Sequence, residues 1–204
     1  MRVAIVGGPG IGKSTLVLQL GDLYHNGAYG EGEKGVWDPR VLDDIAHGRN
    51  PVGVTEYFAA LYDANYRDCV SNDGPGKVIF LEGARITLEA HMAEYPPEHQ
   101  EGLRRVLSMG DSWAFDRIIV LTSSTATVEK HIMLRNRPHE VAENMVRRFR
   151  LIDAAFRQLA AQVREAIIID RDGMEFHERS GLDAIVRAAA LPTYPEIPYR
   201  ELPG

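Results

Sequence analysis

The sequence Gly7-Gly-Pro-Gly-Ile-Gly-Lys-Ser-Thr15 follows a short apolar run and is the most informative stretch of the chain. It fits the pattern G-x-x-x-x-G-K-S/T through Gly7, Gly12, Lys13 and Ser14. Glycines let the backbone curl so that successive N–H groups point at phosphate oxygens, beside a helix N-terminus that favours negative charge. The pattern therefore predicts a phosphate-binding loop between a strand at Arg2–Gly7 and a helix.

The residue types within this loop indicate a nucleoside triphosphate with a divalent cation. Lys13 carries a mobile positive charge that suits the β- and γ-phosphates, and the Ser14 hydroxyl can ligate Mg²⁺. We therefore expect ATP and Mg²⁺ as cofactors. The residues expected to bind the nucleotide are Gly8, Gly10, Ile11, Gly12, Lys13, Ser14 and Thr15.

Short apolar runs that alternate with helical segments indicate the fold class. The runs contain no polar alternation, which is typical of parallel strands that are covered on both faces. They lie at Arg2–Gly7, Lys77–Glu82, Arg117–Leu121 and Ala166–Asp170, and a weaker candidate lies near Tyr29–Trp37. Strand–helix alternation of this kind predicts a three-layer α/β domain with right-handed crossovers.

Composition and charge exclude several classes of protein. The 204 residues suit one domain, predicted at residues 1–190, and a proline-rich C-terminal tail is predicted at 191–204. The single cysteine, Cys69, excludes an internal disulfide and a zinc site with several thiolates. No apolar run approaches the roughly 20 residues of a membrane helix. The net charge of −6 argues against binding DNA by bulk electrostatics. We expect a cytoplasmic protein with no membrane contact.

Charged residues at two further places are candidates for the site. Glu82 ends a predicted strand, where a parallel sheet presents groups at its carboxyl edge, so its carboxylate could hold Mg²⁺ or serve only in structure. Arg135 and Arg137 lie in a predicted lid at about 134–148. Paired arginines there could neutralise a transferring phosphoryl group, and a solvated basic helix face is the alternative.

Three segments together resemble the deoxynucleoside kinase and thymidylate kinase group of P-loop kinases. They are the N-terminal glycine-rich loop, Phe80-Leu-Glu-Gly-Ala-Arg85 and Leu134-Arg-Asn-Arg137, and the resemblance runs over about residues 1–175. It implies a P-loop fold with a parallel sheet of about five strands and an arginine-bearing lid. It also implies direct transfer of the ATP γ-phosphate to a nucleoside or nucleotide.

The same resemblance suggests roles on the acceptor side. Glu82 matches the glutamate of a Glu-Arg-Ser triplet, but Gly83 stands at the arginine position, and Arg85 two residues later becomes the expected acceptor clamp. Glu33, within Glu33-Lys-Gly-Val-Trp37, is similar to the glutamate that removes the proton from the attacking hydroxyl, with Glu31 as a rival. An aromatic slot for a base could come from Trp37, Tyr57, Phe58 and Tyr62, although helical spacing also suits core positions.

Other functions remain open at this level. One is a kinase that acts on a modified base or on an end of DNA. Such a kinase would suit a protein encoded by a phage and active in the cytoplasm of its host, whereas a nucleoside kinase would suit a bacterial protein. Another is a regulatory P-loop ATPase that binds a partner. The protein could also act as a homodimer. A monophosphate acceptor would need further cations, for which the candidates are Arg40, Arg49, Arg67, Arg85, Arg104 and Arg105.

Overall fold

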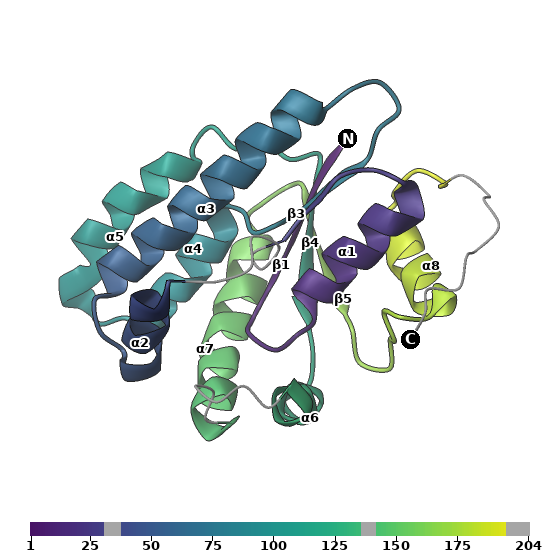
Figure 1. Cartoon of the computed structure of the whole chain (residues 1–204). Coiled ribbons are helices and arrows are strands. Elements are labelled where there is room, and N and C mark those ends of the chain that lie inside the picture. Colours follow the sequence, from purple (N-terminus) through teal and green to yellow (C-terminus); the bar gives the residue numbers. More distant parts are fainter. Residues whose placement is uncertain (31–37, 136–141, 195–204) are drawn as a thin grey trace.

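The structure of the protein is a computed structural model that describes residues 1–30, 38–135 and 142–194 (Figure 1). Its centre is a parallel sheet of five strands in the order β2-β3-β1-β4-β5. The strands are β1 (Arg2–Gly7), β2 (Ala28–Tyr29), β3 (Ile79–Glu82), β4 (Arg117–Thr122) and β5 (Ala166–Asp170). The predicted α/β class and five-stranded parallel sheet are confirmed.

The strand ends differ slightly from those predicted. β3 begins at Ile79 instead of Lys77, because the Lys77 N–H donates to the carbonyl of Gly74 and closes a turn before the sheet. The weak candidate strand begins one residue earlier than predicted, at Ala28, and among its described residues Ala28 and Tyr29 pair with β3. The remainder of that candidate, residues 31–37, lies outside the described part of the chain.

Helices cover both faces of the sheet, as Figure 1 shows. They are α1 (Lys13–Tyr24), α2 (Pro39–His47), α3 (Pro51–Asn72), α4 (Arg85–His91), α5 (Gln100–Leu107), α6 (Thr125–Arg135), α7 (Ala142–Ala160) and α8 (Arg179–Ala188), with short 3₁₀ turns η1 (Met92–Glu94), η2 (Pro97–His99) and η3 (Ser108–Gly110). None of the described helices is both long enough and apolar enough to cross a membrane.

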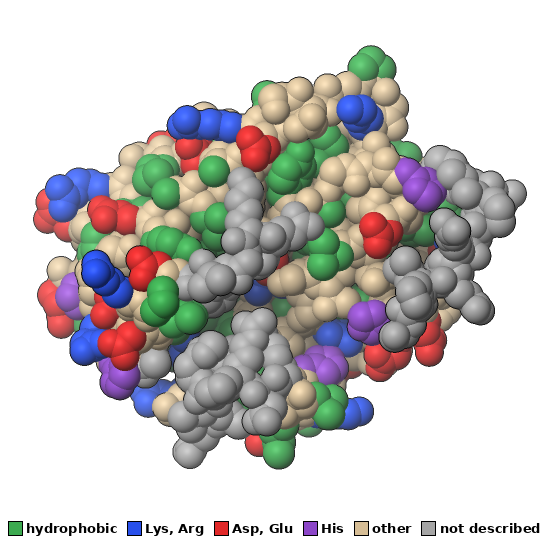
Figure 2. All heavy atoms as spheres, in the orientation of Figure 1, with side chains coloured by type: hydrophobic (Ala, Val, Ile, Leu, Met, Phe, Trp, Pro, Cys, Tyr) green, Lys and Arg blue, Asp and Glu red, His purple; other side chains and the backbone are tan. Residues whose placement is uncertain are grey.

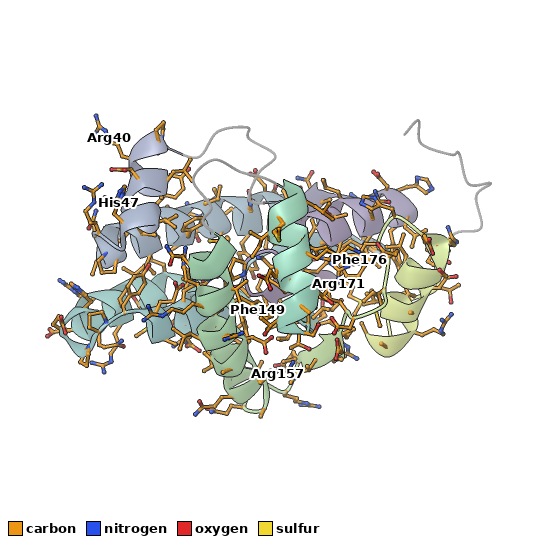
Figure 3. All side chains as sticks on the ribbon, turned by 90° about the horizontal axis from the view of Figure 1, so that it is seen from below. Arg40, His47, Phe149, Arg157, Arg171 and Phe176 are labelled. Carbon is orange, nitrogen blue, oxygen red and sulfur yellow. The ribbon has the colours of Figure 1, made fainter. Side chains whose placement is uncertain are left out.

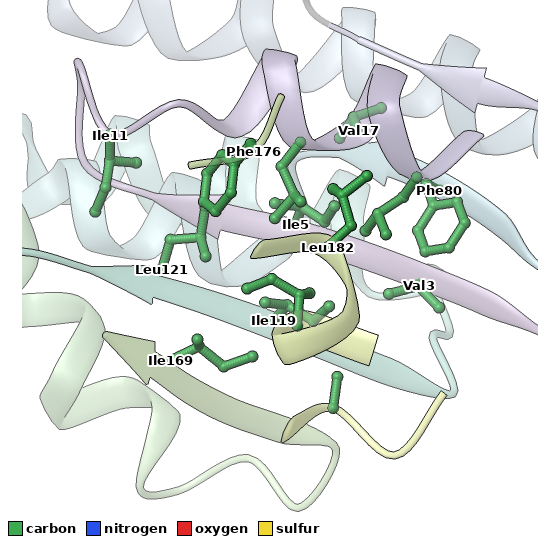
Figure 4. Close-up of a cluster of buried hydrophobic side chains, with 14 of the residues drawn as sticks. Val3, Ile5, Ile11, Val17, Phe80, Ile119, Leu121, Ile169, Phe176 and Leu182 are labelled. Carbon is green, nitrogen blue, oxygen red and sulfur yellow. The ribbon is translucent and has the colours of Figure 1, made fainter. Parts of the chain in front are cut away.

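The side chains of β1 show how the two faces are filled. Successive residues of a strand point to opposite faces. Val3 and Ile5 pack with α1 and α8 on one face (Figure 4), and Ala4 and Val6 pack with α4 and α7 on the other. All four side chains are completely buried, so β1 lies in the middle of the core and leads directly into the glycine-rich loop.

The first residues of the predicted tail pack against the domain. Leu191 is buried, and the Tyr24 hydroxyl donates to the Pro192 carbonyl at 2.6 Å. The Tyr194 ring lies edge-on to Tyr24 and beneath the guanidinium of Arg179, 4.0 Å from its carbon. Residues 192–194 are thus held on α1 and α8, and the rest of the tail, 195–204, lies outside the described residues.

One prediction tests the contribution of α7 to this core. Phe156 is completely buried between α7 and the sheet, whereas Leu151 on the same helix is 46% exposed. We expect Phe156→Ala to lower the free energy of unfolding by about 3–5 kcal/mol, through lost burial and a residual cavity. Leu151→Ala is the matched control and should change it by less than about 0.5 kcal/mol in urea titrations. Equal losses in the two variants would contradict the packing described.

Candidate functional site

The glycine-rich loop between β1 and α1 packs against α7 and against the connection that follows β5. A Cβ on Gly8 would lie 2.6 Å from the Phe149 ring of α7. Gly12 has a φ of +93°, and a Cβ there would lie 2.9 Å from Nη1 of Arg171, in the connection that follows β5. A glycine is therefore required at position 8 by the packing of Phe149 and at position 12 by the backbone conformation.

The loop ends at a helix N-terminus whose N–H groups are available. Gly12 is the N-cap of α1 and provides no side-chain cap, and its carbonyl accepts from the N–H of Leu16 at 3.0 Å. The N–H groups of Lys13, Ser14 and Thr15 precede that first helical hydrogen bond, so they have no acceptor within the helix. Such an end attracts an anion through its free donors and its dipole.

Lys13 and Glu82 meet behind the loop. The Lys13 ammonium donates to the carbonyl of Gly8 at 3.3 Å and lies 3.8 Å from a carboxylate oxygen of Glu82. The parallel register pairs Glu82 with Ile5 of β1, which brings the end of β3 beside the strand that enters the loop. The Glu82 side chain is 1% exposed and that of Lys13 is 12% exposed. A buried carboxylate and a lysine thus share the carboxyl edge of the sheet with the loop.

The donors at this edge suit a magnesium ion. Ser14 is exposed on the first turn of α1, and Glu82 supplies a buried carboxylate, so both predicted metal ligands are oxygen donors. No cluster of three or more histidines, cysteines or carboxylates occurs in the described ranges. Mg²⁺ is usually held by one or two protein oxygens together with phosphates and waters, so this sparse donor set fits it.

Gly83 and Arg85 explain the departure from the expected triplet. Gly83 has a φ of +93°, and a Cβ there would lie 2.4 Å from the ring of Tyr62, which is buried beneath it. An arginine therefore cannot occupy this position while Tyr62 stays in place. The Arg85 side chain, 46% exposed, pairs with Glu89 at 2.9 Å and with Asp111 at 2.5 Å. The acceptor role predicted for Arg85 stays a prediction, and it would require these ion pairs to open.

The described residues include the two ends of the predicted lid at 134–148. Arg135 is the last residue of α6, Arg137 lies outside the described residues, and Arg148 belongs to α7. Arg148 forms an ion pair with Glu94 of η1, whose other oxygen lies 2.7 Å from Nδ1 of His91. Although burial alone would raise the pKa of Glu94, its hydrogen bonds with His91 and Arg148 hold it at about 2. Arg148 thus links α7 to η1.

Several predicted residues are not brought to the loop by the described structure. Glu33, Glu31 and Trp37 lie outside the described residues. Tyr62 is buried against Gly83 and Trp113, and the hydroxyl of Tyr57 lies 3.4 Å from the Asp38 backbone N–H at the start of α2. The core alternative therefore holds for Tyr62, and the proposed aromatic slot stays a prediction for the other residues.

The connection after β5 makes contacts with the loop and with α6 that the sequence did not predict. Arg171 is buried near Phe176 (Figure 3), and its guanidinium donates to the carbonyl of Ile11 at 2.9 Å. Asp172 accepts hydrogen bonds from the Ser123 hydroxyl and from the Ser124 N–H just before α6. These bonds, the Ser123 bond most of all, lower the pKa of Asp172 to about 2. The signal in the sequence was a run of charged residues directly after a buried strand.

Solved structures of other proteins share the fold of this chain, although no match was found at the level of sequence. The sequence matches no known protein-family model, and no curated protein matches it. Solved structures do match. A thymidylate kinase from Candida albicans has a TM-score of 0.67 at 13% identity, covering 91% of this chain and 90% of that one. A deoxyadenosine kinase from M. mycoides with bound dCTP has a TM-score of 0.62 at 15% identity, covering 92% and 97%.

A third structure extends the comparison to a longer protein. NadR in complex with NR has a TM-score of 0.59 at 18% identity, and the match covers 96% of this chain but 53% of that one. At these identities the likeness concerns the fold. The chain has the fold of the P-loop nucleoside and nucleotide kinases, as the resemblance of its sequence segments implied.

Proposed function

We propose that the protein is an Mg-ATP-dependent phosphotransferase that transfers the γ-phosphate to a nucleoside-type acceptor. The observation that supports this most strongly is the placement of Lys13 and Glu82, 3.8 Å apart, beside the free N–H groups of α1. A positive charge for phosphate and a carboxylate for metal then share one edge with an anion-binding helix end. The kinase folds that match the chain support the same function.

Each residue has a defined part in the proposed reaction. The N–H groups of Lys13, Ser14 and Thr15 bind phosphate oxygens, and the Lys13 ammonium leaves the Gly8 carbonyl to contact the β- and γ-phosphates. Ser14 and Glu82 would hold Mg²⁺, which when bound neutralises charge on those phosphates. The acceptor oxygen forms a bond to the γ-phosphorus while the bond from that phosphorus to the bridging oxygen breaks, and ADP leaves.

The proposed reaction also needs a proton acceptor and positive charges near the transferring phosphoryl group. The proton of the acceptor hydroxyl passes to a carboxylate, for which Glu33 is our candidate. Arg135 and Arg137 neutralise the charge that develops on the transferring group. We expect the reaction to take place in the cytoplasm, where ATP is available and where the one cysteine, buried Cys69, stays reduced.

The ion pairs of three candidate arginines favour an uncharged acceptor over a monophosphate. Arg49 pairs with Asp43 and Asp44, Arg67 with Asp63, and Arg85 with Glu89 and Asp111. The other three candidates, Arg40, Arg104 and Arg105, are exposed. The position next to Glu82 carries no side chain, because the Tyr62 ring fills that space. A phosphate dianion bound there would lose its hydration without gaining a cation from these residues.

The alternative functions have weaker support. The face shown in Figure 2 carries acidic and basic side chains interspersed, with no continuous basic stripe over its described residues. A DNA acceptor would therefore depend on a local groove for a single nucleotide. A regulatory ATPase needs a side chain that orients a water molecule for attack on the γ-phosphate. The sequence pattern identifies no glutamine or aspartate for this role. A homodimer remains compatible with the proposed reaction.

The role of Lys13 gives the first test of this function. Lys13→Ala should lower the rate of phosphoryl transfer by at least about 100-fold, because a charge aimed at the transferring phosphate is lost. Its circular dichroism and urea midpoint should stay close to those of the unchanged protein. Lys77→Ala, an exposed lysine before β3, is the control and should keep full activity. Retained transfer in Lys13→Ala would refute the assignment.

The acceptor class gives a second test, with labelled ATP and Mg²⁺ against a panel of acceptors. The panel holds nucleosides, their monophosphates, and DNA with natural and hydroxymethylated bases. We expect label in nucleosides, with kcat/KM at least about 100-fold above that of the matching monophosphates, because a buried phosphate would lack a cation. Preferential labelling of monophosphates or DNA would overturn the acceptor class and leave the kinase chemistry intact. Release of phosphate with no labelled acceptor would favour the ATPase alternative.

A further inference from the structure

The peptide bond between Ile11 and Gly12 is held from outside the phosphate loop. Nη1 of Arg171 donates to the Ile11 carbonyl at 2.9 Å. A peptide unit is planar and trans, so its N–H points opposite to its carbonyl. Because the Ile11 carbonyl points toward Arg171, the N–H of Gly12 points away from Arg171. This contact therefore orients one of the donors of the loop.

The guanidinium of Arg171 is itself fixed by its surroundings. Its Nη2 donates to the carbonyl of Met174 at 3.0 Å, and its carbon lies 4.5 Å from the centre of the Phe176 ring. Arg171 as a whole is only 5% exposed, so this geometry is protected from solvent. A planar group with several donors can make all these contacts at once, which an ammonium on a flexible chain cannot.

His131 of α6 completes the arrangement. Its Nδ1 lies 3.2 Å from Nη1 of Arg171. A guanidinium has donors only, so Nδ1 of His131 must be the acceptor and must carry no proton. Protonation of the ring would replace this hydrogen bond with two positive groups in contact. His131 is half-buried on the side of α6 that faces the loop, so protons from solvent can reach it.

We infer that Arg171 and His131 are positioning residues for the phosphate loop, and that protonation of His131 weakens the binding of ATP. This inference rests on the proposed function, because it takes the loop to be the site of the ATP phosphates. Arg171 and His131 touch the backbone of the loop and act through it.

The other charges around His131 determine the direction of the pH dependence. Burial lowers the pKa of His131 below 6.5, and the positive charges of Arg171 and Lys130 lower it further. Glu175 and a hydrogen bond with the Gly10 backbone oppose this. The ring is therefore neutral at pH 7. The pKa of His131 in this arrangement is lower than that of an unperturbed histidine. The hydrogen bond between His131 and Arg171 therefore supports ATP binding fully above pH 6.5, and this support is lost as the pH falls through the lowered pKa.

The direct test compares the affinity for Mg-ATP at pH 7.5 and at lower pH, without any acceptor. His131→Asn keeps an uncharged acceptor near the position of Nδ1 but cannot be protonated, and His177→Asn, an exposed histidine of the same region, is the matched control. Protonation of ATP itself affects all three proteins equally. At the lower pH, we expect the unchanged protein and His177→Asn to lose about 10-fold more affinity for Mg-ATP than His131→Asn loses. A change of this size corresponds to the loss of one hydrogen bond to a charged group.

Each outcome of this comparison is decisive. The same pH dependence in His131→Asn and in the unchanged protein would overturn the role of His131. Failure of the unchanged protein to bind Mg-ATP at pH 7.5 would instead overturn the proposed function. Circular dichroism at both pH values shows that the proteins compared are folded.

Arg171→Lys tests the other half of the pair. This variant keeps the positive charge but cannot contact Ile11, Met174 and His131 together. We expect its affinity for Mg-ATP at pH 7.5 to fall by about 10-fold, and its pH dependence to become as shallow as that of His131→Asn. Unchanged affinity together with the steep pH dependence of the unchanged protein would contradict the role of Arg171. The urea midpoint separates a loss of ATP binding from a loss of folding.

Discussion

The phosphate loop must turn its N–H groups inward, and this is possible only because its carbonyls find partners elsewhere. The Ile11 carbonyl accepts from Arg171, and the Gly12 carbonyl accepts from the N–H of Leu16. These donors come from the connection after β5 and from the helix backbone. The loop has no donor side chains between Gly8 and Gly12 that could satisfy its own carbonyls. The surrounding elements provide these donors instead.

The same requirement explains the layout of the helices near the loop. Phe149 of α7 fills the space that a side chain at Gly8 would need, and Ile132 of α6 does the same at Gly10. Asp172 holds the start of α6 while its neighbour Arg171 holds the loop. The connection after β5 therefore fixes two things at once, the backbone of the phosphate loop and the helix that ends at Arg135.

The sequence predicted the sheet and the loop because both depend on local patterns. Apolar runs without alternation indicated the parallel strands, and glycine spacing with Lys13 indicated the loop. The contacts of Arg171 could not be predicted, because the partner Ile11 lies 160 residues away in the chain. The burial of Tyr62 under Gly83 was equally hidden, since helical spacing alone does not say which aromatic side chain meets a glycine of another element. Glu33 and Arg137 stay predictions.

The proposed reaction requires Lys13 and Glu82, which pair in this structure, to separate when a nucleotide binds. A crystal structure with Mg²⁺ and a non-hydrolysable ATP analogue tests this most directly. We expect phosphate oxygens on the N–H groups of Lys13, Ser14 and Thr15, with the Lys13 ammonium moved from the Gly8 carbonyl onto the phosphates and Glu82 turned toward the metal or its waters. An analogue bound elsewhere, with Lys13 still on Gly8 and Glu82, would contradict the account.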